Sequence, residues 1–193
     1  DYAEAYYNVG VTLQDQGKLE EAIGSCKKAI SIKPDYAEAY YNMGVTLQDQ
    51  GKLEKAIEAY KKALSIKPDY YEAYFNIGVA LQDKGNLEES IQAYNSTIEI
   101  NPNYIDAIFN IAYAYIDLED NTSAIEYLNK LKNIQHSNLS ILLKVIFLCK
   151  FQEIADYKLL YDKYCGILNK QEKTKKFINS KKQVSVAALI GFG

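Results

Sequence analysis

Eight carboxylates recur at fixed spacing along the 193-residue chain. They fall into four pairs: Glu4 and Asp15, Glu38 and Asp49, Glu72 and Asp83, and Asp106 and Asp117. Paired acids can act as the general acid and the nucleophile or base of a glycosidase. Here the same pair returns in every segment, which is the behaviour of a surface and not of a single active site. We therefore expect an acidic binding surface with no catalytic residue.

The cysteines and the single histidine do not indicate a metal or redox centre. Cys26, Cys149 and Cys165 lie far apart and have no neighbours at metal-ligand spacing, so they predict packing positions in a reducing compartment. His136 has no partnered nucleophile or metal cluster near it in the sequence. We expect no metal and no cofactor.

The composition argues against two further classes of function. All 22 basic residues are lysines, so the planar donor best suited to guanine and phosphate is missing and sequence-specific nucleic-acid binding is not expected. The most apolar run, residues 139–151, is too short to cross a bilayer and contains Lys144 and Lys150. No signal peptide is recognisable, and these features together predict a soluble, cytoplasmic protein without a membrane span.

A 34-residue repeat organises most of the chain. The segment DYAEAYYNVGVTLQDQGKLEEAI from Asp1 returns as DYAEAYYNMGVTLQDQGKLEKAI from Asp35, and further copies begin at Asp69 and Asn103. Each copy contains two apolar stripes at helical spacing; Tyr6, Val9, Gly10 and Leu13 form the first stripe of the first copy. Each copy therefore predicts a pair of packed helices.

Glycine and proline mark the ends of these helices. A glycine able to adopt positive φ stands between the two stripes, and a proline that cannot continue a helix follows the second. The glycines are Gly17, Gly51 and Gly85, and the prolines are Pro34, Pro68 and Pro102. In the fourth copy Glu119 and His136 occupy these two positions, so the histidine is interpreted as an eroded repeat position.

Small residues complete a pattern that resembles the tetratricopeptide repeat (TPR) family. They are Gly10, Gly44, Gly78 and Ala112 in the first helices, and Ala22, Ala56, Ser90 and Ala124 in the second. The resemblance implies an all-α fold, a right-handed TPR superhelix (α-α solenoid) with four hairpins in residues 1–136. The units run over about 3–34, 37–68, 71–102 and 105–136, and residues 137–169 are expected to form a degenerate fifth hairpin or cap.

One stripe of each first helix lies opposite the packed residues. In the family this face lines the concave groove, so the resemblance implies ligand contacts at its residues. Besides the eight carboxylates they are Asn8, Asn42, Asn76 and Asn110, the aromatics Tyr7, Tyr41, Phe75 and Phe109, and Tyr113. The asparagines offer a donor and an acceptor at a regular rise, which suits the amides of an extended peptide. A similar ladder occurs in the repeat arm of O-linked N-acetylglucosamine transferases; a packing role is the alternative, and both stay open.

The acidic groove predicts the charge of its ligand. Some relatives bind the C-terminal carboxylate of chaperones through lysines and arginines in this groove, whereas the groove residues named above include neither. We therefore expect neutral or basic extended peptide or protein segments to bind. Four hydrogen bonds of about 1 kcal/mol each reach only roughly millimolar affinity, so aromatic contacts must add to them.

The residues after the repeats change in character. Residues 170–182 form a basic linker or helix, which is either solvated or binds anions, and residues 183–193 have the pattern of a strand running into a glycine-rich turn. The strand resembles the start of a sulfotransferase domain. The sequence thus predicts a non-catalytic peptide-binding scaffold. The alternatives are the substrate-recruiting arm of a larger sulfotransferase-like or glycosyltransferase-like protein, and a homo-oligomer formed by end-to-end stacking.

Overall fold

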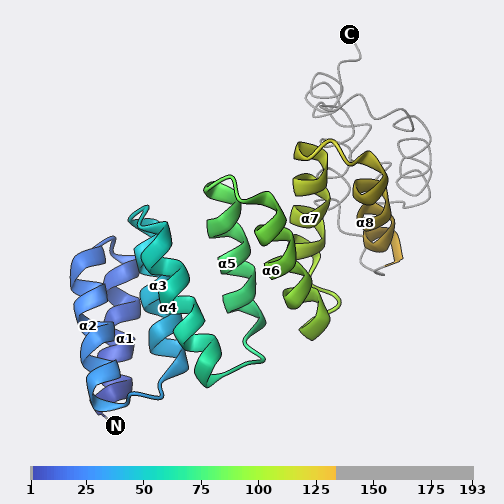
Figure 1. Ribbon diagram of the computed structural model, residues 1–193. Helices are drawn as coiled ribbons and strands as arrows, with labels where there is room; N and C mark the ends of the chain where they lie inside the picture. The colour runs from blue at the N-terminus through green and yellow to red at the C-terminus, as the bar shows by residue number, and fades with distance from the viewer. Residues whose placement is uncertain (1, 134–193) are drawn as a thin grey trace, which may run out of the picture.

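A computed structural model describes residues 2–133, which form α-helices arranged as four successive hairpins (Figure 1). The helices are α1 (Tyr2–Asp15), α2 (Leu19–Ile32), α3 (Ala37–Asp49), α4 (Leu53–Ile66), α5 (Tyr71–Asp83), α6 (Leu87–Ile100), α7 (Ile105–Asp117) and α8 (Asn121–Asn133). Within these residues there is no strand, and the predicted all-α solenoid is confirmed. The predicted fifth hairpin, basic segment and C-terminal strand lie outside the described residues.

Every hairpin turns on a residue with positive φ. The φ angles of Gly17, Gly51 and Gly85 are 73°, 71° and 79°, as the spacing of the glycines predicts. Glu119 takes the same conformation in the fourth hairpin, with φ of 60°. An L side chain in this region costs about 1–2 kcal/mol, so the packing of α7 against α8 imposes the turn even where glycine is missing.

The two helices of a hairpin approach each other at a glycine. A Cβ atom added to Gly44 would lie 2.5 Å from Cε1 of Tyr60, and one added to Gly78 would lie 2.5 Å from Cε1 of Tyr94. Both tyrosines are completely buried. Because Gly44 and Gly78 have no side chain, there is space at these positions for a whole tyrosine ring from the next helix.

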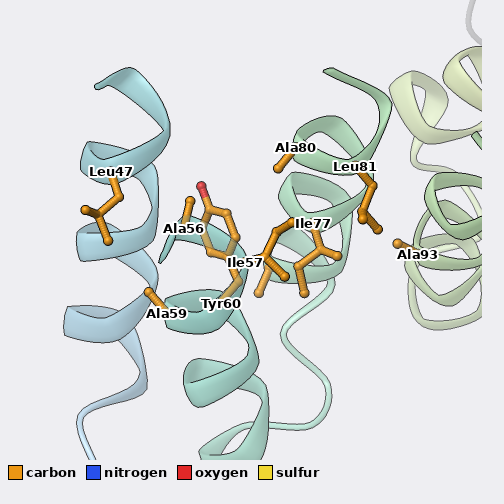
Figure 2. Close-up of a cluster of buried hydrophobic side chains, with 10 residues drawn as sticks. Leu47, Ala56, Ile57, Ala59, Tyr60, Ile77, Ala80, Leu81 and Ala93 are labelled. Carbon is orange, nitrogen blue, oxygen red and sulfur yellow. The ribbon is translucent and has the colours of Figure 1, made fainter. Parts of the chain in front are cut away.

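The apolar core continues from one hairpin into the next. Figure 2 shows one cluster that extends from Leu47 on α3 through Ile57 and Tyr60 on α4 to Ile77 on α5 and Ala93 on α6. A second cluster, which includes Ile91, Tyr94 and Ile111, continues it into α7. Each hairpin is thus stabilised by its neighbours, as expected for a solenoid.

The first hairpin is less completely packed than the sequence predicts. Val9, assigned to an apolar stripe, is 49% exposed, whereas Ile77 and Ile111 at the same repeat position are 6% and 0% exposed. The two isoleucines pack against a preceding hairpin. Since no described residue precedes α1, nothing in the described structure covers Val9.

The close approach of α3 and α4 predicts opposite effects for two glycine-to-alanine substitutions. Gly44→Ala would overpack Tyr60 and is expected to lower the free energy of unfolding by about 1–3 kcal/mol. Gly24→Ala is the matched control, because Gly24 lies inside α2 with nothing within 4 Å of an added Cβ, and a gain of about 0.5–1 kcal/mol is expected. Urea unfolding of both variants measures the difference, and equal effects would contradict it.

The positive φ of Glu119 predicts that glycine stabilises the fourth hairpin. Glu119→Gly removes the steric cost of a side chain at positive φ, while the added flexibility of glycine favours the unfolded chain. The net effect should be a rise in the free energy of unfolding of about 0.5–1 kcal/mol. Glu119→Ala removes the same carboxylate but keeps the Cβ, so it should bring no such gain. The melting temperatures of the two variants test this, and a gain in both would assign the effect to charge.

Candidate functional site

The inner face of the array is formed by the first helix of each hairpin. α1 contacts α3 and α3 contacts α5 across hairpin boundaries, whereas successive second helices meet less. In a curved stack the elements on the inner side lie closest together. The predicted ligand-contact stripe is therefore on the helices that line the inside of the curve.

Charge is divided between the two sets of helices. α1, α3, α5 and α7 together carry eight carboxylates and no lysine. The twelve lysines before residue 134 all lie on the second helices or on the connections. Four of the eight acids, Asp15, Asp49, Asp83 and Asp117, end their helices, where the helix dipole is negative and an acid is unfavourable. The inner face is thus acidic, and the four acids at the helix C-termini do not stabilise their helices.

The aromatic residues of the stripe join successive hairpins. Three of them pack against the tyrosine at the N-cap of the next first helix: the ring centroids of Tyr7 and Tyr36 are 5.3 Å apart, those of Tyr41 and Tyr70 4.8 Å, and those of Phe75 and Tyr104 5.0 Å. Lysine ammonium groups cover two of these tyrosines, with Lys33 4.7 Å from the Tyr36 ring and Lys67 4.5 Å from the Tyr70 ring. Sequence reasoning did not single out these N-cap tyrosines, although their recurrence every 34 residues was the available signal.

The asparagines differ in their surroundings along the array. Asn8 is exposed and its side chain makes no hydrogen bond with the described residues, whereas Asn42 is only 8% exposed and its amide donates to Sγ of Cys26 at 3.8 Å. The amide of Asn76 donates to the hydroxyl of Tyr41 at 3.0 Å, and that of Asn110 to the hydroxyl of Tyr94 at 3.2 Å. Three of the four amide groups therefore tie one hairpin to the preceding one.

The change of partner between Asn76 and Asn110 has a simple cause. The residue that corresponds to Tyr41 one unit later is Phe75, which has no hydroxyl. Asn110 donates instead to Tyr94, whose hydroxyl in turn donates to Oε1 of Gln82 at 2.7 Å. Tyr60 makes the equivalent bond to Gln48 at 2.9 Å, and burial raises the pKa of both Tyr60 and Tyr94. Both hydroxyls stay neutral, and that of Tyr94 links Asn110 to Gln82.

The carboxylates lie close enough to the aromatic rows to affect their protonation. Burial and then the charge of Glu38 raise the pKa of Tyr7, and burial followed by the charge of Asp106 raises that of Tyr104. Nζ of Lys67 lies 3.8 Å from Oε1 of Glu38, and both side chains are substantially exposed. Burial also raises the pKa of the Asp117 carboxyl.

The remaining predicted residues add no reactive group. Tyr113 is 37% exposed, and Asp49 accepts a hydrogen bond from Nε2 of Gln14 at 2.9 Å. Among residues 2–133 no group of three or more histidine, cysteine or acidic side chains is placed to hold a metal ion. In the same part of the chain no helix is both long and apolar enough to cross a membrane.

Fold and repeat pattern together define a solenoid of helical hairpins, and sequence comparison identifies its family. A family model described as TPR repeat matches residues 12–51 and 46–85, and models described as tetratricopeptide repeat match residues 71–104 and 105–137. The chain belongs to the tetratricopeptide repeat family. The matches end at residue 137, and the predicted sulfotransferase-like segment lies beyond both them and the described residues.

Solved structures share the architecture. A crystal structure of MamA is 30% identical in sequence, with a TM-score of 0.66, and the match covers 69% of this chain and 78% of that one. A second MamA structure is 23% identical, with a TM-score of 0.75 over 93% of this chain and 97% of that one. The first TPR of Spaghetti (RPAP3), bound to the HSP90 peptide SRMEEVD, is 24% identical, with a TM-score of 0.59 over 61% of this chain and 94% of that one. No curated protein matches the sequence.

The hydroxyl of Tyr94 is predicted to stabilise the junction between the third and fourth hairpins. Tyr94→Phe keeps the ring but leaves Asn110 and Gln82 without this partner, so the free energy of unfolding should fall by about 1–3 kcal/mol. Tyr113→Phe removes a hydroxyl that makes no hydrogen bond with the described residues, and should stay within about 0.5 kcal/mol of the parent. Urea denaturation compares the two; equal losses would show that the hydroxyl network contributes nothing specific.

Proposed function

We propose that the chain is a non-catalytic scaffold whose inner face binds an extended protein segment of neutral or basic character. The observation that supports this most directly is the charge of the first helices, which carry eight carboxylates and no lysine. A lysine-rich segment in this groove gains an opposite charge at each unit. Membership of the tetratricopeptide repeat family is consistent with a protein-interaction scaffold.

Comparison with a peptide-bound relative sharpens the charge argument. The first TPR of Spaghetti (RPAP3) holds a peptide ending in EEVD, which is acidic. An acidic tail placed along α1, α3 and α5 would meet Glu4, Glu38 and Glu72, with Lys67 as the cation nearest to Glu38. Like charges at these positions oppose binding, so the shared fold does not extend to the same ligand.

The asparagines contribute acceptors in this proposal. The amide groups of Asn42, Asn76 and Asn110 already donate within the array, while no described residue donates to their side-chain oxygens. Backbone N–H groups of an extended segment supply suitable donors. The half-buried aromatics beside them add apolar contact, which hydrogen bonds of about 1 kcal/mol each need for useful affinity.

Two alternatives remain predictions outside this proposal. The first, the substrate-recruiting arm of a larger transferase-like protein, rests on residues 183–193, which lie outside the described residues. End-to-end self-assembly would use the apolar surface at the end of the first hairpin, where Tyr2 is 82% exposed and Val9 is 49% exposed. No residue of the described chain covers this surface.

The proposed charge preference predicts which of two matched peptides binds. A lysine-rich extended peptide should bind the 193-residue chain more tightly than the same peptide with glutamate at the lysine positions, and its affinity should fall as salt screens the charges. Fluorescence anisotropy at low and physiological ionic strength measures both affinities. Tighter binding of the glutamate peptide would overturn the proposal.

A matched pair of variants locates the binding face. Glu38→Gln with Glu72→Gln neutralises two inner acids without changing their size, and should weaken the lysine peptide by about three- to tenfold at low salt. Glu21→Gln with Glu88→Gln makes the same charge change on α2 and α6, and should change the affinity by less than about twofold. An equal loss in both pairs would indicate binding through net charge alone.

A further inference from the structure

A pocket lies between the second helices of the first two hairpins and the first helix of the second, away from the residues of the acidic stripe. It has a volume of about 780 Å³ and is bounded by α2, α3 and α4. Ile23, Met43, Leu47 and Ala59 form its apolar floor. Ile23 and Met43 are only partly buried, so apolar surface is open to an incoming group.

The rim of the pocket is basic. Lys27, Lys52, Lys55, Lys61 and Lys62 line it together with only two acids, Glu20 and Glu58. All five lysines are exposed, and none forms an ion pair with another described residue. Glu20 already accepts a hydrogen bond from Nε2 of Gln50 at 3.1 Å. The lining therefore carries more lysines than acids, and its charge is opposite in sign to that of the inner face.

The repeat provides an internal comparison, because α4 and α6 occupy the same places in the repeat register one unit later as α2 and α4. There, Asn86, Glu89, Asn95 and Ser96 stand at the positions of Lys52, Lys55, Lys61 and Lys62. The floor also closes: Ile57 and Ile77, which correspond to Ile23 and Met43, are 8% and 6% exposed. The lysine-rimmed pocket is thus a property of the first junction and not a requirement of the fold.

The shape of the pocket selects among anionic occupants. Its lining runs along α4 from Lys52 to Ser65, a distance of about 20 Å at the rise of an α-helix. Such a trough between helices accepts a helix of three to four turns, whose apolar face covers the floor and whose acidic flanks meet the lysines. A compact anion would leave most of the floor uncovered.

We infer that this pocket is a second docking site, which binds an acidic amphipathic helix of a partner protein. Apolar residues spaced at i, i+3, i+4 and i+7 on that helix contact Ile23, Met43 and Leu47, and its carboxylates pair with the rim lysines. The site is separate from the proposed inner-face ligand, since it uses α2, α4 and residues of α3 outside the acidic stripe, and has the opposite charge.

Met43 is the only methionine of the chain and provides a direct reporter of the pocket floor. The probe is a helical peptide of about 15 residues with leucine at the apolar positions and glutamate elsewhere, titrated into the full chain labelled with ¹³C at the methionine methyl. The Met43 methyl signal, assigned by its loss in Met43→Leu, is expected to shift on binding. Binding without this shift would place the peptide elsewhere and overturn the inference.

The repeat supplies a variant that the fold already accommodates. Lys55→Glu, Lys61→Asn and Lys62→Ser together reproduce the residues found at the α4/α6 junction, and should weaken the peptide by at least about tenfold at low salt. Lys18→Glu, Lys28→Asn and Lys33→Ser make the same charge change outside the pocket, and should leave binding within about twofold. Equal losses in both variants would overturn the inference.

Three further arms distinguish other occupants. A lysine counterpart of the peptide should not bind, and equal affinity for it would remove the charge argument. Vesicles containing phosphatidylserine test a lipid surface; pocket-dependent binding to them without peptide binding would replace the proposed partner by a membrane. A Met43 shift caused by raising the protein concentration alone, with a dimer in sedimentation, would identify a second copy of the chain as the occupant.

Discussion

The close packing of two helices at one repeat position is the constraint on which the rest of the array depends. Tyr60 and Tyr94 are fully buried because Gly44 and Gly78 have no side chain to exclude their rings. Once seated there, each ring places its hydroxyl within reach of a glutamine on the first helix, and that of Tyr94 also reaches an asparagine of the next hairpin. Packing within one hairpin thereby sets the geometry of the junction that follows.

The inner face combines structural and binding roles in the same residues. Its aromatic rings and three of its asparagine amides hold neighbouring hairpins together, so their orientation is established before any ligand arrives. Preorganised groups of this kind lose little conformational freedom on binding. The carboxylates are different, since most are exposed and they define the sign of the surface; Asp49, which accepts from Gln14 of the preceding hairpin, also contributes to a junction.

Local patterns in the sequence were sufficient to predict the hairpins, because glycine turns, proline stops and apolar stripes act within one unit. Even the exception at Glu119 follows the predicted register. The acceptors to which the Asn42 and Asn110 amides donate could not be predicted, since Cys26 and Tyr94 belong to the preceding unit and their distance depends on how two hairpins pack. The lysine-rimmed pocket was missed for the same reason; its signal was the departure of Lys55 and Lys61 from the residues one repeat later.

The pairing of a small residue with a larger partner limits how such an array can change during evolution. Gly44 and Tyr60 lie sixteen positions apart in one hairpin, as do Gly10 and Cys26, and Ala112 and Leu128 at the corresponding places. Duplication of a whole hairpin copies both members of a pair, so the array can lengthen without a new packing solution. Recombination inside a hairpin separates them, and could set an alanine against a tyrosine ring. Intact hairpins are therefore the units that can be exchanged between arrays of this kind.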